Sequence, residues 1–495
     1  MKLKKDFKSN YMLWFVLIAF IIICGILFIS PMVGVADQGD FDRVMGKSSL
    51  SLLDSDLNNP NFNRFYDYIV TDYQINYGLN TLLFPFGTSM GYLITLITFI
   101  CKLLGQNIFK TQYLAICYAI IYIFALSLIL KYLNIKDNFK RILLIILMLI
   151  VFLDGNYIIW FNSLYGEPMM IITLLLFIAS VLGYIHYKYV LKSNEKIAYK
   201  ISLVIIAGLL FLGSKLQVSM TMPFILILVG KILFDNKKNL SKGKFISLCL
   251  LASLLIIYPV EINLTSGSLS NDTQYNSVFY GVLNGSDTPE QDLIDLGLNP
   301  DMAVEAGKHS YLNNEDYVKY IPRTEITEKE FYSKISNGKL AKFYLTHPLR
   351  LIQGMEYTAS KAFYTSTSLG KCLESYSKEP VTEFNRFTAW SNFRENKIPK
   401  SLIFIISIYL IVFIYSVYKY LKNKKNNVIR NRIYIIWLLI LISGIQFPMP
   451  YVGNGQADTA KQLFLFNFIF DIFFVLIISI IISKFIDIVR SKLKK

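Results

Sequence analysis

Long uninterrupted runs of apolar residues constrain the fold of this chain more than any other feature. Tyr11–Ser30 and Leu463–Ile482 are two of them. An α-helix rises about 1.5 Å per residue, so about 20 apolar residues cross the hydrocarbon core of a bilayer, which is about 30 Å thick. Several such runs in a chain of 495 residues, of which 54% are hydrophobic, predict an all-α protein that crosses a membrane many times.

The runs predict about ten spanning helices and an orientation for them. The expected spans are 11–31, 112–130, 142–160, 168–185, 201–222, 223–234, 246–262, 402–418, 433–450 and 463–483. The segments 1–10, 131–141, 186–200, 231–245, 419–432 and 484–495 then share one side and hold 28 Lys and Arg but only five Asp and Glu. Because Lys- and Arg-rich loops stay in the cytoplasm, both termini are predicted to be cytoplasmic. The net charge of +16 therefore reflects topology and does not indicate a nucleic-acid partner.

One further apolar segment, Ser89–Leu104, is interpreted as a helix lying in the outer interface. If it crossed the membrane, every later loop would change sides and the lysines of 419–432 would lie outside. The chain then divides into three parts: an N-terminal membrane module (1–262, with a first outer loop at 31–111 and the interfacial helix at 89–104), a mostly helical extracytoplasmic region of about 135 residues (263–400), and a C-terminal membrane module (401–495).

An acidic motif, Asp37-Gln38-Gly39-Asp40-Phe41-Asp42-Arg43, follows the first span directly. Charges at a membrane edge are costly, which makes them candidates for function. Its three carboxylates, on Asp37, Asp40 and Asp42, could supply a general base or oxygen ligands for a divalent cation such as Mg²⁺ or Mn²⁺. The alternative is a solvated turn that ends the first helix.

Further polar residues on the outer side are candidates for binding. The residues expected to bind substrate are Asn162, Tyr165, Glu167, Asp458 and His347. Those expected to bind a phosphate group of a substrate are Arg43, Lys215, Lys461 and His309. Each has a structural alternative. A carboxylate before Pro168 is favourable at a helix N-terminus without any ligand, a lysine can snorkel to the interface, and a loop histidine is more often structural than catalytic. Asp471, about two turns inside the last span, needs a partner or a polar cavity.

The sequence lacks the motifs that are typical of several other classes of protein. There is no zinc-ligand spacing, P-loop, nucleotide-binding glycine-rich turn or Ser/His/Asp arrangement, and four of the five cysteines lie in apolar runs, so no disulfide framework is expected. Acidic groups, a few cations and many aromatic residues on the outer face instead suit a lipid-carried substrate. Its chain would stay in the membrane while its phosphate-linked head enters a polar pocket.

Six motifs lie in order between Ala36 and Asp471: ADQGDFDRVM, NSLYGEP, VFYGVLNGS, LGLNPDMAVEAGKHSY, THPLRL and GNGQADTAKQLFLFNFIFD. In these the sequence resembles the WsfD-like bacterial glycan-biosynthesis hexosyltransferases of the GT-C class. The resemblance implies a GT-C-like bundle in the bacterial plasma membrane, with juxtamembrane helices in the first outer loop and an active site facing outside. It also implies that Asp40, or else Asp37, is the base or a metal ligand. Where that family often has an acidic residue and a histidine, this chain has Gln456 and Gln462.

The predicted activity is transfer of a hexose from a polyprenyl-phosphate-linked donor, such as undecaprenyl-phosphate-hexose, to a glycan or teichoic-acid-like acceptor, with membrane lipids as the other partners. A glycolipid transporter or flippase is the alternative from another class. It needs polar groups through the depth of the bundle and often an inverted repeat. A non-catalytic assembly protein is a third hypothesis, and it leaves the membrane charges of Asp471 and Lys215 unexplained.

Overall fold

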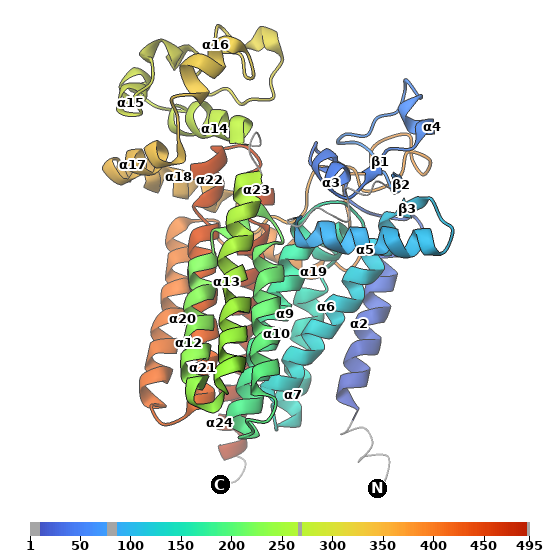
Figure 1. Ribbon diagram of the computed structural model, residues 1–495, viewed down its shortest axis with the longest axis vertical. Helices are drawn as coiled ribbons and strands as arrows, with labels where there is room; N and C mark the ends of the chain where they lie inside the picture. Colours follow the sequence, from blue (N-terminus) through green and yellow to red (C-terminus); the bar gives the residue numbers. More distant parts are fainter. Residues whose placement is uncertain (1–9, 77–86, 266–269, 493–495) are drawn as a thin grey trace.

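The computed structural model describes residues 10–76, 87–265 and 270–492, which form a helical bundle with two lobes at one end (Figure 1). The bundle contains α2 (Tyr11–Leu27), α6 (Thr111–Leu133), α7 (Asn138–Phe152), α9 (Glu167–Ile185), α10 (Ile197–Leu212), α12 (Met222–Asn236), α13 (Lys242–Thr265), α20 (Leu402–Lys422), α21 (Asn427–Gln446) and α24 (Phe464–Lys492). A helix therefore stands at each of the ten predicted spans.

Six of these helices are long and apolar enough to cross a membrane, namely α6, α9, α13, α20, α21 and α24 with their direct continuations. A seventh span results if α7 is joined to α8 (Gly155–Ile158) and the 3₁₀ turn that ends at Phe161, across a bend of 53°. The apolar helices α2 and α10 are shorter. The predicted all-α multi-pass membrane fold is confirmed, while the number of ten complete crossings stays a prediction.

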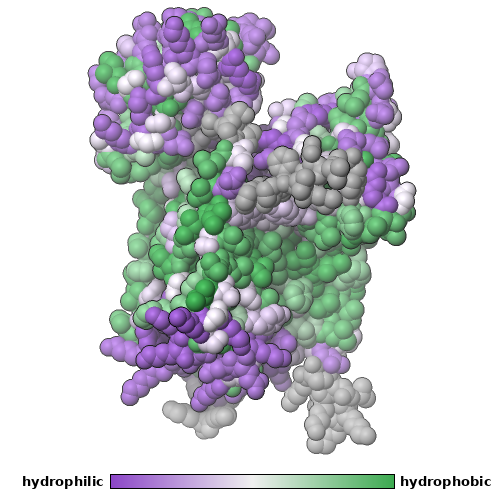
Figure 2. All heavy atoms as spheres, in the orientation of Figure 1, coloured by the Kyte–Doolittle hydropathy of each residue, from purple (hydrophilic) through white to green (hydrophobic). Residues whose placement is uncertain are grey.

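The two ends of the bundle differ in polarity. Figure 2 shows a hydrophobic belt around the middle of the bundle and a hydrophilic rim at the end where α2 begins and α24 ends. This lysine-rich end includes Lys188, Lys192, Lys422 and Lys424. The other end, here called the lobed end, carries both lobes. In the belt, large apolar side chains such as Ile120 are exposed, as expected for a surface that faces lipid.

The first-loop lobe (31–76 and 87–110) stands over α2 and α6 (Figure 1). It contains α3 (Phe41–Lys47), α4 (Asp54–Leu57), α5 (Ser89–Leu103) and a small antiparallel sheet in the order β1 (Leu50–Ser51), β2 (Asp72–Ile75), β3 (Ile108–Lys110). The sheet was not predicted. The juxtamembrane helix α5 lies across the end of the bundle rather than along it. Its first residue donates its backbone N–H to Gly213 O at the end of α10 (2.8 Å), which fixes α5 at that level.

The helical lobe (270–363) has its own apolar core, built around Tyr275, Phe279 and Phe331. Its α-helices are α14 (Ser270–Ser277), α15 (Pro289–Asp295), α16 (Glu325–Thr327), α17 (Asn337–Thr346) and α18 (Pro348–Ser360). The core continues into the bundle through Phe447 and Phe466. The lobe is thereby seated on the ends of α21 and α24.

A crossing segment (364–388) leads from the helical lobe back to the first-loop lobe. Gly34 and Ala36 donate their N–H groups to Lys371 O and Gly370 O, both at 3.0 Å. A Cβ on Gly370 would lie 1.7 Å from Asp67 O, so this approach is possible only for glycine. The segment ends at α19 (Ala389–Lys397), which precedes α20. The crossing segment therefore holds the loop that leads to Asp37.

Candidate functional site

The acidic motif after α2 folds into a tight turn that begins α3. Asp37 Oδ1 accepts backbone N–H groups from Gly39 (2.7 Å), Asp40 (2.9 Å) and Phe41 (3.2 Å), and Gly39 has a φ of +104°. Asp37 is buried, and burial raises the pKa of its carboxyl group against the opposing effect of these N–H groups. The turn is thus present, with Asp37 buried and committed to shaping it, while Gly39 and Asp42 remain exposed.

Asp40, the residue just before α3, is held by two cations. Arg43, one turn later on α3, pairs with Asp40 Oδ1. Lys461, from α23 (Thr459–Gln462), places its Nζ 2.8 Å from Asp40 Oδ2. The side chain of Asp40 is 28% exposed and that of Lys461 10% exposed. The fold therefore joins two of the predicted residues that lie 421 positions apart.

Two further residues complete this group. Lys461 Nζ lies 3.4 Å from Asp458 Oδ2, and Gln38 Nε2 donates to Asp458 Oδ1 at 2.5 Å. Gln38 Oε1 also accepts from Lys461 at 3.4 Å. Asp40, Arg43, Gln38, Asp458 and Lys461 are called the Asp40 cluster below. Sequence reasoning did not single out Gln38, although its position between two candidate aspartates was a usable signal.

The charges of the Asp40 cluster hold one another ionised. Burial acts to raise the pKa of Asp40, but the positive charges of Lys461, Lys215 and Arg43 outweigh it and hold this pKa well below its ordinary value. Burial likewise acts to lower the pKa of Lys461, and the carboxylates of Asp40 and Asp458 raise it well above the ordinary value. Both groups are charged at any physiological pH.

A second ion pair lies beside the cluster, at the lobed end of α9. Lys215, in the link between α10 and α11 (Leu216–Ser219), pairs with Glu167 Oε1. Glu167 is fully buried, and its Oε2 atom has no hydrogen-bond partner among the described residues. Because Lys215 acts on the pKa of Asp40, its charge belongs to the same electrostatic site.

Tyr165 and Asn162 lie beneath the site and are both buried. Tyr165 donates its hydroxyl to Ala36 O (2.9 Å). Asn162 donates to Val33 O and accepts from the Thr111 hydroxyl, both at 2.6 Å. Their polar atoms hold the first loop on the bundle, and the Tyr165 ring lies 5.4 Å from Lys461 Nζ. The predicted role of these two residues in substrate binding stays a prediction.

The two predicted histidines both belong to the helical lobe. His309 packs edge-on against Tyr280 (5.4 Å between ring centroids), and burial lowers its pKa while the charge of Asp458 opposes the shift. His309 therefore lies within electrostatic range of the Asp40 cluster. His347 stacks on Phe343 and has its Nε2 3.2 Å from Asp295 Oδ2. It is part of the lobe's own structure and lies outside the cluster.

The expected divalent cation does not fit the carboxylates that were assigned to it. One oxygen of Asp37 accepts three backbone N–H groups, and each oxygen of Asp40 faces a cation. Within residues 10–76, 87–265 and 270–492, no group of three or more His, Cys, Asp or Glu side chains could hold a metal. We therefore derive no step through a metal ion.

Asp471 has its partner in Arg394 of α19, a residue that sequence reasoning missed. Arg394 Nη1 lies 2.6 Å from Asp471 Oδ2, and both side chains are 0% exposed. The same oxygen accepts from the Tyr157 hydroxyl (2.7 Å) and Trp390 Nε1 (2.9 Å). We call these four residues the Arg394 cluster. This cluster supplies the partner that the sequence analysis required for the carboxylate of Asp471.

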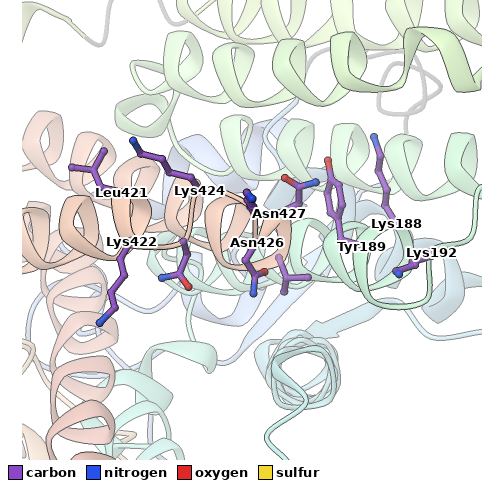
Figure 3. Close-up of a pocket in the computed structure, with 11 residues that line it drawn as sticks. Lys188, Tyr189, Lys192, Leu421, Lys422, Lys424, Asn426 and Asn427 are labelled. Atoms are coloured by element: carbon purple, nitrogen blue, oxygen red, sulfur yellow. The ribbon is translucent and has the colours of Figure 1, made fainter.

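A shallow hollow of about 740 Å³ lies at the opposite, lysine-rich end (Figure 3). It is formed by the turn between α20 and α21 and by Lys188–Lys192, at the end of α9. Lysines and asparagines make up most of its lining, and no carboxylate belongs to it. It is part of the positively charged rim and offers no group for acid–base chemistry.

Comparison with known proteins gives one match. The profile of the family described as YfdI N-terminal transmembrane domain matches residues 1–495, the whole chain. No curated protein and no solved structure matches the chain. The family match supports the GT-C-like class of membrane glycosyltransferase that the sequence predicted, while the narrower WsfD-like resemblance stays a prediction.

Proposed function

Since the chain belongs to the YfdI N-terminal transmembrane domain family of GT-C-like membrane glycosyltransferases, we propose that it transfers a hexose from a polyprenyl-phosphate donor to a glycan or teichoic-acid-like acceptor. The observation that carries this proposal is the Asp40 cluster. It presents a partly exposed carboxylate between two cations, and a third cation, Lys215, lies within electrostatic range. A base and a phosphate-binding group are the two parts that this reaction needs.

The reaction follows from the charges of the cluster. The donor phosphate competes with Asp40 for Lys461 and Arg43, because an oxyanion can take the place of a carboxylate beside a cation. Asp40, released from its partners, accepts the proton of the acceptor hydroxyl. The hydroxyl oxygen bonds to the anomeric carbon as the carbon–oxygen bond to phosphate breaks. Lys461 and Lys215 then stabilise the charge that develops on the phosphate. A single displacement of this kind inverts the anomeric configuration.

The location of the polar groups favours a transferase over a transporter. The Asp40 cluster lies on α3 and α23, at the lobed end of the bundle (Figure 1). A transporter needs its binding site near the middle of the membrane. By the positive-inside rule, the lysine-rich end faces the cytoplasm. We propose accordingly a bacterial plasma-membrane location with the site outside and the polyprenyl chain of the donor in the bilayer.

Replacement of Asp40 tests this function. In Asp40→Asn the base is lost, so hexose transfer from polyprenyl-phosphate-hexose should fall about 10²- to 10⁴-fold, measured with purified protein in lipid vesicles. The matched control is Asp42→Asn, because Asp42 lies on the same turn but pairs outward with Arg64 and is 57% exposed. Its activity should stay within about twofold, since exposed pairs contribute little.

Two outcomes would contradict the proposal. Unchanged transfer by a folded Asp40→Asn protein would remove Asp40 as the base. In sealed right-side-out vesicles, a water-soluble acceptor should be used only when it is added outside. Use of an acceptor trapped inside instead would reverse the orientation.

A further inference from the structure

A cavity of about 210 Å³ lies on the bundle side of the helical lobe, next to the Asp40 cluster. Its lining comes from the turn after α14, from α17 and α18, from α22 (Met449–Asn454) and from the α22–α23 link, and includes Asn284, Tyr344, Arg350, Gln353, Tyr357 and Gln456. We propose that this cavity binds one neutral sugar ring of the acceptor. The inference rests on the proposed function and adds a binding site to it.

The walls of the cavity are fixed in place. Tyr451, from α22 (Met449–Asn454), lies against α18 because Gly354 has no side chain; a Cβ there would be 2.2 Å from the Tyr451 ring. The Tyr451 hydroxyl donates to Gly281 O and the Tyr357 hydroxyl to Gln456 O, both at 3.1 Å. The cavity is therefore formed before any ligand arrives, which lowers the entropic cost of binding.

Several polar groups in the lining have no use within the protein. The Tyr344 hydroxyl is buried and has no hydrogen-bond partner among the described residues, and Tyr344 as a whole is 4% exposed. The side-chain amides of Gln353, which is exposed, and of the partly buried Gln456 make no recorded hydrogen bond within the described part of the chain, so both are available to a ligand. A buried hydroxyl without a partner is costly, so it points to a ligand that supplies one. Hydroxyl and amide groups beside flat tyrosine rings suit the hydroxyls and the apolar face of a sugar.

Charge distinguishes this cavity from the phosphate site. Among the described residues, Arg350 is the only cation in its lining; its Nη2 lies 2.6 Å from Asp292 Oδ2 and also donates to the Ser286 hydroxyl. That pairing leaves no free positive charge for a phosphate. The Asp40 cluster, in contrast, combines Lys461 and Arg43 around one carboxylate. The donor phosphate is therefore assigned to the cluster, and a neutral ring to the cavity.

Size and position assign the ring to the acceptor. Drug-sized ligands occupy pockets of about 300–1,000 Å³, so 210 Å³ accommodates a single ring. Gln456 in the lining and Asp458 in the cluster are two residues apart, which limits their Cα atoms to a separation of about 7 Å. The cavity thus adjoins the Asp40 cluster, on the helical-lobe side of the link that leads to Lys461.

Binding of simple sugars by the full-length protein in lipid nanodiscs tests the cavity directly. Saturation-transfer difference NMR with methyl glucoside, galactoside and mannoside should show binding of at least one glycoside, unaffected by inorganic phosphate. Tyr344→Phe and Gln353→Ala should each weaken it by about three- to tenfold through loss of one hydrogen bond. Gln291→Ala, on the surface of α15 and outside the cavity, should bind like the wild type.

The transferase assay separates this inference from the proposed function. Tyr344→Phe and Gln353→Ala should raise the KM for the acceptor about three- to tenfold and leave the KM for the donor unchanged. Absence of glycoside binding, or binding that neither variant weakens, would overturn the sugar cavity even in an active enzyme. Glycoside binding that both variants weaken, in a protein without hexose transfer, would support the cavity and contradict the proposed function.

Discussion

The Asp40 cluster and the Arg394 cluster contain the same chemistry, an aspartate paired with a basic residue, yet they differ in exposure. In the Arg394 cluster both charged side chains are 0% exposed, and Arg394 also donates to Phe363 O and the Thr365 hydroxyl. In the Asp40 cluster the aspartate is 28% exposed, and its partners Arg43 and Lys461 come from two separate elements. A ligand can reach the second cluster but not the first.

This difference decides what each pair can do. Ions transferred from water into the protein interior lose several kcal/mol each, and only well-placed partners recover that cost. The Arg394 cluster therefore has one arrangement, and it ties α19 to α24 through Asp471. The partly hydrated Asp40 cluster can exchange one anion for another at modest cost. The first cluster positions helices, and the second can bind and release a phosphate.

The largest effect that the comparison predicts is on stability, through Arg394. In Arg394→Ala the carboxylate of Asp471 stays buried without its cation, so the free energy of unfolding should fall by about 3–5 kcal/mol. Thermal unfolding of the purified protein in detergent measures this. Lys140→Ala serves as the control, because Lys140 and Asp487 form a pair whose aspartate is 63% exposed; its change should stay below about 1 kcal/mol. If the two variants unfolded at the same temperature, exposure would not determine how much these two ion pairs contribute to stability.

Lys461→Met should show the opposite pattern. The variant lacks one charge that stabilises the departing phosphate, so kcat for hexose transfer should fall about 10²- to 10³-fold. The variant should lose less stability than Arg394→Ala, since Asp40 and Asp458, 28% and 32% exposed, can both take up water. Lys334→Met, on the exposed surface of the helical lobe, is the control and should be fully active. A large loss of stability without loss of kcat would place Lys461 with the structural cluster instead.

The same comparison shows which parts of the molecule the sequence could predict. The spans were predictable because each is one continuous apolar run, and the orientation of Ser89–Leu104 followed from the charges of later loops. Asp40, Asp458 and Lys461 were found because each is a charge at a membrane edge. The two- to four-residue strands of the first-loop lobe are too short to give a pattern.

Partners distant in the sequence could not be predicted. Arg394 lies 77 positions before Asp471, in a segment that resembles any polar loop. Asn162 and Tyr165 were assigned to substrate from their place in the NSLYGEP motif on the outer side. Their hydrogen bonds to Val33 O and Ala36 O each join positions 129 apart, which no local pattern reveals.

Lys371 is a buried basic residue that, unlike Lys461 and Arg394, has no carboxylate partner among the described residues. Lys371 Nζ donates only to oxygens of Thr367 and Leu369 among the described residues, and burial lowers its pKa to about 7. In the unfolded chain the lysine pKa is about 10.4. Between these values the unfolded state binds more protons, so the free energy of unfolding should rise with pH by up to about 1.4 kcal/mol per unit.

Thermal unfolding at pH 7, 8 and 9 measures the contribution of Lys371. The free energy of unfolding of the wild type should rise from pH 7 to pH 9. In Lys371→Met the contribution of Lys371 to this rise should be absent, because methionine has no proton to lose. The Asp40 cluster adds no slope here: the pKa of Asp40 is lowered and that of Lys461 raised, so both lie outside the range. Parallel pH profiles for wild type and Lys371→Met would mean that Lys371 keeps its proton in the folded state. A buried cation without a carboxylate partner would then stay charged through hydration, and the presence of a charged partner would not decide its protonation.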